Sequence, residues 1–205
     1  MIDQLNAGLR RVPAWLLYIV LPLPALWFLY LGATGGLGAE PIKALEHELG
    51  EFALQLLIVG LAVTPLRRFV GVNLIKFRRA IGIMAFFYVF LHLLTWLVLD
   101  VQILSQIWAD IVKRPYITVG MAAFVVLLPL ALSSNNYSVR KLGPRWRKLH
   151  KLTYLAVLLG GLHYVMLVKG FQLEPLLYMA VILGLLVLRT DIKKLRRRFT
   201  PQSAT

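Results

Sequence analysis

The stretch FRRAIGIMAFFYVFLHLLTW, residues 77–96, sets two arginines in front of an apolar run that continues to residue 99. The apolar residues form one long block and do not alternate with polar ones. About 20 consecutive apolar residues are enough to cross the roughly 30 Å hydrocarbon core of a bilayer as an α-helix. The segment therefore predicts a transmembrane helix over residues 80–99 with the arginines at one membrane surface.

Five other apolar blocks are of similar or slightly shorter length. Over all 205 residues, 59% are hydrophobic and the mean hydropathy is +0.73, which is higher than in ordinary soluble domains. We predict one all-α integral membrane domain over residues 1–205, a bundle of six transmembrane helices surrounded by lipid. The helices are expected near residues 13–32, 49–66, 80–99, 116–132, 152–168 and 172–189. Pro22 and Pro24 are expected to kink the first of them.

The basic residues are concentrated on one side of the predicted bundle. Nineteen lie on that side: Arg10, Arg11, Arg67, Arg68, Lys76, Arg78, Arg79, Arg140, Lys141, Arg145, Arg147, Lys148, Lys151, Arg189, Lys193, Lys194, Arg196, Arg197 and Arg198. Four lie on the other: Lys43, Lys113, Arg114 and Lys169. Because cytoplasmic loops carry the excess of lysine and arginine, both termini are expected in the cytoplasm. The external connections are then residues 33–48, 100–115 and 169–171.

Charge and cysteine content exclude several classes of protein. The net charge of +14 falls in clusters between apolar blocks, without the aromatic interleaving of single-strand nucleic-acid binders. We therefore expect no nucleic-acid partner. The absence of cysteine excludes disulfides, thiolate zinc sites, covalently attached haem and cysteine-ligated iron–sulfur clusters. The first apolar block is long enough for a membrane anchor, and no small-residue cleavage site follows it, so we expect no cleavable signal peptide.

Two histidines lie inside apolar blocks, His92 in the third and His163 in the fifth. The third helix rises from about Arg79 and the fifth rises in the same direction from about His150. Each buried histidine is 13 residues further on, about 20 Å at 1.5 Å per residue. Both are therefore expected at one depth, in the outer half of the membrane. A polar side chain in a membrane helix marks a functional site by default, although each histidine could also satisfy a single interhelical hydrogen bond.

The matched depth favours a pair of ligands over two separate hydrogen bonds. Gly160 and Gly161 beside His163 would leave room for a flat group against the backbone. Neutral imidazole suits iron, copper or zinc. With no cysteine or buried carboxylate nearby, a haem held by two histidines is the best fit. We predict that His92 and His163 bind the iron of one b-type haem.

His150 lies about 20 Å below His163, at the depth of a second haem near the cytoplasmic surface. Thirteen residues turn a helix by about 1300°, which leaves the two histidines nearly on opposite faces. The position on the third helix that corresponds to His150 is Arg79, so a second axial ligand is missing. We predict that His150 supports a second, weaker haem site, so that the chain binds one or two haems. The alternative is an interfacial histidine among arginines and lysines.

His47 begins HELGE, which departs from the zinc-protease pattern HExxH because its fifth position is Glu51. A zinc-protease site is therefore excluded. We expect His47 in the polar start of an external helix, with a docking or quinone role as the alternative.

Five segments together resemble a known family: VTPLRR (63–68), FRRAIGIMAFFYVFLHLLTW (77–96), KRPYITVG (113–120), LGPRWRKLHKLTY (142–154) and HYVMLVK (163–169). In order and spacing they resemble MsrQ, the haem-binding membrane subunits of bacterial periplasmic protein-methionine-sulfoxide reductase systems. The wider relatives are the ferric reductase and NADPH oxidase transmembrane domains, whose third and fifth helices each carry a histidine pair. This chain differs from those relatives in having one histidine on the third helix.

The resemblance implies electron transport, with the catalytic site on a partner subunit. It implies a subunit of the cell inner membrane that passes electrons to a periplasmic molybdopterin-containing reductase, which reduces oxidised methionines in damaged proteins. The implied donors are a cytoplasmic flavin reductase, acting through bound FMN, or the quinone pool. The family's FMN-linked arginine pair matches Arg78 and Arg79. Two guanidiniums at a helix start can hold a flavin phosphate, although the positive-inside rule alone would place arginines there.

Two other functions fit the same composition. One is a generic quinol-linked di-haem cytochrome b that uses no flavin and serves another acceptor. The other is a haem-free transporter in which the histidines only hold helices together. Transporters of that kind usually have discontinuous helices or paired halves, and the sequence has neither.

The expected orientation gives the direction of electron transfer. We expect electrons to enter near residues 67–79 and to leave through the external surface formed by 33–48 and 100–115.

Overall fold

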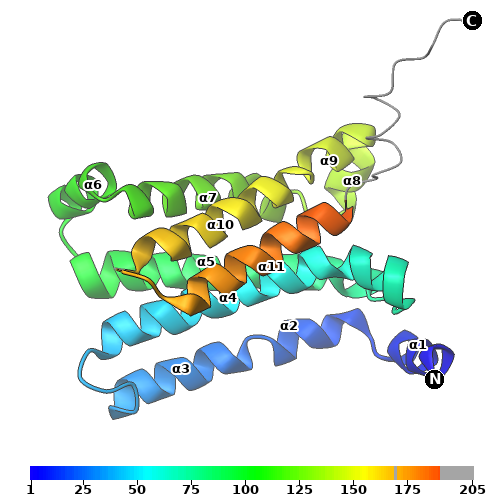
Figure 1. The fold of residues 1–205 in the computed structure, drawn as a ribbon, viewed down its shortest axis with the longest axis horizontal. Coiled ribbons are helices and arrows are strands. Elements are labelled where there is room, and N and C mark those ends of the chain that lie inside the picture. The colour runs from blue at the N-terminus through cyan, green and yellow to red at the C-terminus, as the bar shows by residue number, and fades with distance from the viewer. Residues whose placement is uncertain (169, 190–205) are drawn as a thin grey trace, which may run out of the picture.

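The computed structural model describes residues 1–168 and 170–189, and every regular element within them is a helix (Figure 1). The all-α prediction is therefore confirmed for these residues. In chain order the elements are α1 (Ile2–Arg11), η1 (Ala14–Leu16), α2 (Leu17–Val20), α3 (Leu23–Thr34), α4 (Pro41–Pro65), η2 (Leu66–Val70), η3 (Ile75–Phe77), α5 (Arg78–Leu94), η4 (Thr95–Val101), α6 (Leu104–Lys113), α7 (Pro115–Leu132), α8 (Asn136–Leu142), α9 (Pro144–Leu149), α10 (Leu152–Leu167) and α11 (Leu173–Arg189). The expected cytoplasmic C-terminus and the external Lys169 lie outside the described residues.

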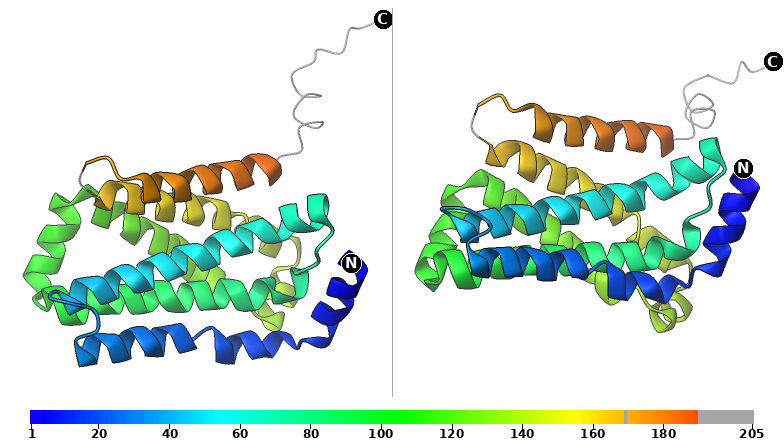
Figure 2. Two further views of the ribbon diagram at one scale, coloured as in Figure 1. Left: turned by 60° about the horizontal axis from the view of Figure 1, so that its bottom comes forward. Right: turned by 90° about the horizontal axis from the view of Figure 1, so that it is seen from below.

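The long helices lie side by side and form a bundle (Figures 1 and 2). Within the described residues, four helical stretches are long and apolar enough to cross a membrane: Ala14–Thr34, Pro41–Val70, Ile75–Val101 and Pro115–Leu132. The other two expected helices are present as α10 and α11, with 16 and 17 residues. The chain is thus an all-helical membrane protein with at least these four apolar stretches.

Two of the expected external connections contain helix, which corrects the predicted boundaries. Residues 33–48 were expected outside the second helix, but α4 already begins at Pro41, where proline at the first helical position has no N–H to leave unpaired. His47 therefore lies inside α4. Residues 100–115 contain α6, and α7 begins directly after it with Pro115 at its first position. The pattern of apolar blocks did not reveal α6, because its charged and polar residues lower its mean hydropathy.

The first apolar stretch is interrupted between α2 and α3, as Pro22 and Pro24 predict. The buried hydroxyl of Tyr88, on α5, fills this break. It donates a hydrogen bond to the carbonyl of Leu21 (2.6 Å) and accepts one from the N–H of Ala25 (2.9 Å). In an unbroken helix these two backbone groups would bond to each other. Tyr88 thus satisfies both groups and joins the first stretch to the rest of the core.

Neighbouring helices alternate in direction, so α4 runs parallel to α7 and α5 runs parallel to α10 (Figure 1). α4 packs on α5, α7 packs on α10, and α11 covers α4 and α10. The N-terminus, α8 and α9 lie at the end of the bundle where α5 begins, and α6 lies at the opposite end (Figures 1 and 2). Arg78 and Arg140 therefore belong to one end of the bundle, and Lys43 and Lys113 belong to the other. The basic residues in the described part of the chain are segregated as the sequence predicts.

Candidate functional site

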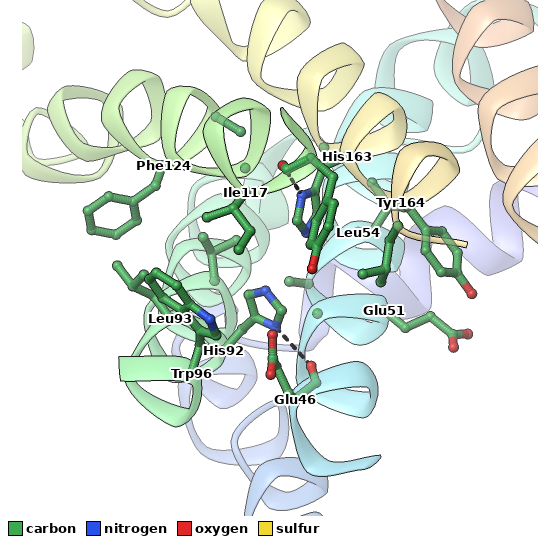
Figure 3. A pocket seen from close by; sticks show the side chains of 18 of the residues that line it. Glu46, Glu51, Leu54, His92, Leu93, Trp96, Ile117, Phe124, His163 and Tyr164 are labelled. Atoms are coloured by element: carbon green, nitrogen blue, oxygen red, sulfur yellow. Dashed lines mark hydrogen bonds between the residues drawn. The ribbon is translucent and has the colours of Figure 1, made fainter. Parts of the chain in front are cut away.

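His92 of α5 and His163 of α10 lie close together (Figure 3), in the half of the bundle nearest α6, which we call the outer half. Their ring centroids are 6.1 Å apart, and the ring planes are inclined at 79°. The prediction that these two histidines lie at one level on parallel helices is confirmed. The two rings can meet because α5 and α10 start at the same end of the bundle and each carries its histidine in its second half.

A backbone carbonyl on a neighbouring helix holds each ring. Nδ1 of His92 lies 2.8 Å from the carbonyl oxygen of Glu46 on α4. Nδ1 of His163 lies 2.7 Å from the carbonyl oxygen of Tyr116 on α7. A carbonyl oxygen can only accept a hydrogen bond, so Nδ1 must carry the proton in both rings. Nε2 of each ring is then an unprotonated nitrogen with a free lone pair, the form that binds metals.

A glycine one helical turn after each carbonyl makes room for the ring. A Cβ atom added to Gly50 would lie 2.9 Å from Nδ1 of His92, and one added to Gly120 would lie 2.8 Å from Nδ1 of His163. Both distances are shorter than any ordinary van der Waals contact. Since Gly50 follows Glu46 by four residues and Gly120 follows Tyr116 by four, the Nδ1 edge of each ring packs against one turn of helix. The two halves of the site are built in the same way.

The two histidines face a cavity of about 400 Å³ between α4, α5, α7 and α10 (Figure 3). This volume falls within the usual range of roughly 300–1,000 Å³ for small-molecule and cofactor sites. Its outer end is polar, and its inner part is apolar. Besides the two histidines, the polar lining includes Lys43, Glu46, His47, Glu51, Asp100, Arg114 and Tyr116. The apolar lining includes Leu54, Leu57, Phe124, Leu127 and Ala156. The cavity therefore suits a largely apolar molecule with a polar edge.

The set of donors fits a metal that brings most of its own ligands. In the described part of the chain no group of three or more histidine and acidic residues could hold a metal ion. The two imidazoles, with ring centroids 6.1 Å apart, could each supply one ligand to the same metal. Haem brings its iron already bound to a macrocycle, so His92 and His163 would be enough to hold it.

His150 lies at the other end of the bundle, between α9 and α10, and is not brought to this cavity. Its ring stacks on Trp146 with centroids 3.9 Å apart, and its Nε2 lies 3.1 Å from Oγ of Ser133. The Ser133 hydroxyl donates to the carbonyl of Pro129 at 2.6 Å. It must therefore accept from His150, whose Nε2 carries the proton here. Partial burial, and then the charges of Arg78 and Arg79, lower the pKa of His150.

The two predicted flavin-binding residues are exposed at the start of α5. The Arg79 guanidinium donates a hydrogen bond of 2.7 Å to the side-chain oxygen of Asn136, at the start of α8. Arg78 and Arg79 both lie close enough to His150 to influence its charge state. The structure thus brings three sequence-predicted residues together at this end of the bundle, well apart from the paired histidines.

His47 lies near the polar start of α4, as expected, and its side chain also lines the cavity. Its ring packs edge-on against Tyr164, with centroids 6.0 Å apart. One turn further along α4, Glu51 accepts hydrogen bonds from Tyr178 (2.8 Å) and Gln55 (2.9 Å). This polar cluster ties α4 to α11 beside the cavity.

Sequence reasoning found the paired histidines but missed the groups that hold them. Of the two glycines expected to make room, Gly160 lines the cavity, whereas Gly161 packs against Ile182 of α11. The glycines that contact the histidine rings are Gly50 and Gly120. Their signal in the sequence is weak, because a single glycine in an apolar helix indicates only that something packs closely there. The carbonyls that hold the rings could not be identified from the sequence, because every residue has one.

Comparison with known proteins identifies the family to which the chain is related. Residues 48–161 match the family described as ferric reductase like transmembrane component. The chain is 50% identical, over 185 residues, to the protein-methionine-sulfoxide reductase heme-binding subunit MsrQ of Brucella ovis, Brucella suis and Brucella abortus. The aligned region covers 90% of this chain and 84% of each relative. No solved structure matches the chain.

Proposed function

This chain belongs to the MsrQ family of heme-binding subunits of protein-methionine-sulfoxide reductase, and from that premise we propose that His92 and His163 bind one b-type haem. The observation that carries the proposal is the pair of Nε2 lone pairs facing one cavity, with ring centroids 6.1 Å apart. A haem bound there would supply one-electron oxidation and reduction of its iron.

The chain's own residues would hold, orient and shield that group. The carbonyls of Glu46 and Tyr116 fix the tautomer and direction of the two rings, which is the usual role of outer-shell partners at metal sites. Apolar side chains such as Leu57 and Leu127 exclude water from the inner part of the cavity. The polar outer end provides cations, Lys43 and Arg114, on the side where an acidic edge of a cofactor would face solvent.

The test is replacement of each ligand by alanine in protein purified after haem-replete expression. We expect His92→Ala and His163→Ala each to lose the low-spin absorption spectrum of that haem before and after reduction with dithionite. His47→Ala is the matched control, because the His47 ring lines the same cavity while the carbonyls of Glu46 and Tyr116 hold the other two rings. This variant should keep the low-spin spectrum. An unchanged spectrum in either ligand variant would refute the pairing.

We further propose that His150 supports a second, weaker haem site at the opposite end of the bundle. To ligate iron through Nε2, His150 would have to release Ser133 and give up the Nε2 proton, which costs free energy and fits a weaker site. Its lowered pKa favours the neutral ring that ligation requires. Haem bound per polypeptide should therefore be lower in His150→Ala than in wild type if two haems are present.

The function that follows is transport of electrons across the bacterial inner membrane. We propose that all six long helical segments span the bilayer and that both termini face the cytoplasm, as the basic residues favour. Electrons would enter near residues 67–79 from a cytoplasmic flavin reductase, with FMN held by Arg78 and Arg79, or from the quinone pool. They would leave at the surface formed by 33–48 and 100–115, to a periplasmic molybdopterin-containing subunit that reduces methionine sulfoxide.

The entry route can be tested with a pair of double variants. Arg78→Ala with Arg79→Ala should slow haem reduction by a cytoplasmic flavin donor and lower the FMN that copurifies, while leaving the spectrum of the outer haem intact. Arg10→Ala with Arg11→Ala removes the same charge from the same side of the bundle, outside residues 67–79, and its haem should be reduced at the wild-type rate. Equal rates and equal FMN in both double variants would exclude Arg78 and Arg79 as the flavin site and favour a quinol donor.

A further inference from the structure

Helix α6, residues Leu104–Lys113, runs across the outer end of the bundle instead of along it (Figures 1 and 2). It carries three large apolar side chains that the rest of the chain leaves uncovered. Leu104 is 81% exposed, Trp108 is 70% exposed and Val112 is 66% exposed. Their spacing of four residues places them on one face of the helix. We refer to these three residues as the α6 stripe.

The exposed surface of α6 is divided lengthwise into an apolar and a polar half. At about 100° per residue, the stripe occupies one flank, and the exposed residues Gln106 and Lys113 lie on another flank, roughly 140–160° around the helix from the middle of the stripe. Ile107 and Ile111 are partly covered by the protein on a third flank. A helix surrounded by water has no reason to sort its exposed residues in this way. A helix at a membrane surface has one flank in lipid and one in water, and that arrangement accounts for the division.

The apolar flank continues the outer surface of the bundle. Val98, Leu99 and Ile103, which lead into α6 from η4, are also exposed, at 59%, 40% and 52%. Val98 and Leu99 belong to the last part of Ile75–Val101, a stretch long and apolar enough to cross a membrane, and Ile103 follows it. Trp108 sits in the middle of the stripe, and tryptophan is enriched where hydrocarbon meets headgroups.

We propose that α6 is an interfacial helix whose stripe of Leu104, Trp108 and Val112 is embedded in the outer leaflet of the bilayer. The occupant of this face is lipid, and the inference rests on the proposed membrane placement of the bundle. The polar flank faces water. A protein partner that docks at this end would then contact the loop before α4 and the polar mouth of the cavity.

The position of α6 affects the haem site, because α6 bonds to the first turn of α7, and that turn orients His163. Arg114 pairs with Asp110 of α6 (3.2 Å), and the hydroxyl of Thr118 donates to the carbonyl of Ile111 (2.5 Å). Tyr116, between them, supplies the carbonyl that holds the His163 ring. Anchoring α6 in lipid therefore fixes the level of the cavity mouth relative to the membrane surface.

Because the chain has no cysteine, single cysteines can be placed along α6 and labelled with a nitroxide. The stripe variants are Leu104→Cys, Trp108→Cys and Val112→Cys, and the variants on the polar flank are Gln106→Cys and Lys113→Cys. In phosphatidylcholine nanodiscs, collisions with oxygen report lipid exposure, and collisions with a water-soluble nickel chelate report water exposure. We expect the ratio of oxygen to nickel collisions to be several times higher at each stripe position than on the polar flank.

Nickel accessibility at the stripe equal to that on the polar flank would overturn the proposal. Protection of the stripe that arises only after a purified reductase partner is added would also overturn it, and would assign this face to protein docking. The haem spectrum of every variant is recorded alongside. An apoprotein that still gives the expected pattern would leave α6 in the membrane while disproving the haem assignment.

Discussion

Replacing Gly120 by alanine should weaken haem binding without altering a ligand. The new Cβ would lie 2.8 Å from Nδ1, 3.0 Å from Cε1 and 3.4 Å from Cγ of His163. Ordinary contacts between such atoms are about 3.5–4.0 Å, so the ring must retreat by roughly 0.5–1 Å. Retreat stretches the 2.7 Å bond from Nδ1 to the carbonyl of Tyr116. Loss of an outer-shell partner of this kind typically lowers metal affinity about 10–100-fold.

The assay is titration of apoprotein in nanodiscs with haemin, followed by the Soret band. Gly50→Ala should behave in the same way, because its Cβ would lie 2.9 Å from Nδ1 of His92. Gly184→Ala is the control: Gly184 lies in α11 with nothing within 4 Å of the added Cβ, so haem affinity should not change. If Gly120→Ala bound haem as tightly as Gly184→Ala and kept the same low-spin spectrum, the packing of His163 on this helical turn would not matter for binding.

Further predictions concern the core and the opposite end of the bundle. Tyr88→Phe leaves the carbonyl of Leu21 and the N–H of Ala25 without their partner, which should cost about 1–3 kcal/mol of stability; a thermal-unfolding curve that matches wild type would contradict this role. His150→Ala should lower haem per polypeptide and leave the outer haem spectrum intact, and an unchanged ratio would return His150 to a structural role. Because the folded-state pKa of His150 is lowered, the unfolded chain takes up a proton at higher pH than the folded chain does. Stability should thus be full above the ordinary histidine pKa of about 6.5 and fall as the pH drops below it, whereas His150→Gln should lose that part of the pH dependence in thermal melts.

The sequence was sufficient to predict that the two histidines lie at the same level as each other, because that level follows from helix rise and from the place where each helix begins. His92 and His163 are each 13 residues beyond a basic cluster that marks the membrane surface, and the structure brings them together. The kink at Pro22 was predictable for a similarly local reason, since proline removes a backbone donor wherever it stands.

The groups that hold the histidines could not be predicted, because they depend on which helices become neighbours. Carbonyls of Glu46 and Tyr116 are chemically identical to every other carbonyl in the chain, and only packing selects them. The start of α4 at Pro41 was missed for another reason. Residues 41–48 are polar enough to suggest a loop, but their helix lies where polar side chains can face the mouth of the cavity.

The two halves of the histidine site are built from matching residues on two pairs of helices. Glu46, Gly50 and His92 recur as Tyr116, Gly120 and His163, at intervals of 70, 70 and 71 residues. The pair α4–α5 and the pair α7–α10 are therefore two versions of one unit, each holding half a coordination sphere. Under the proposed ligation, neither unit can capture the cofactor alone. The binding free energy of the haem would then stabilise the contact between the two helix pairs. Loss of the haem should therefore weaken that contact before either pair unfolds.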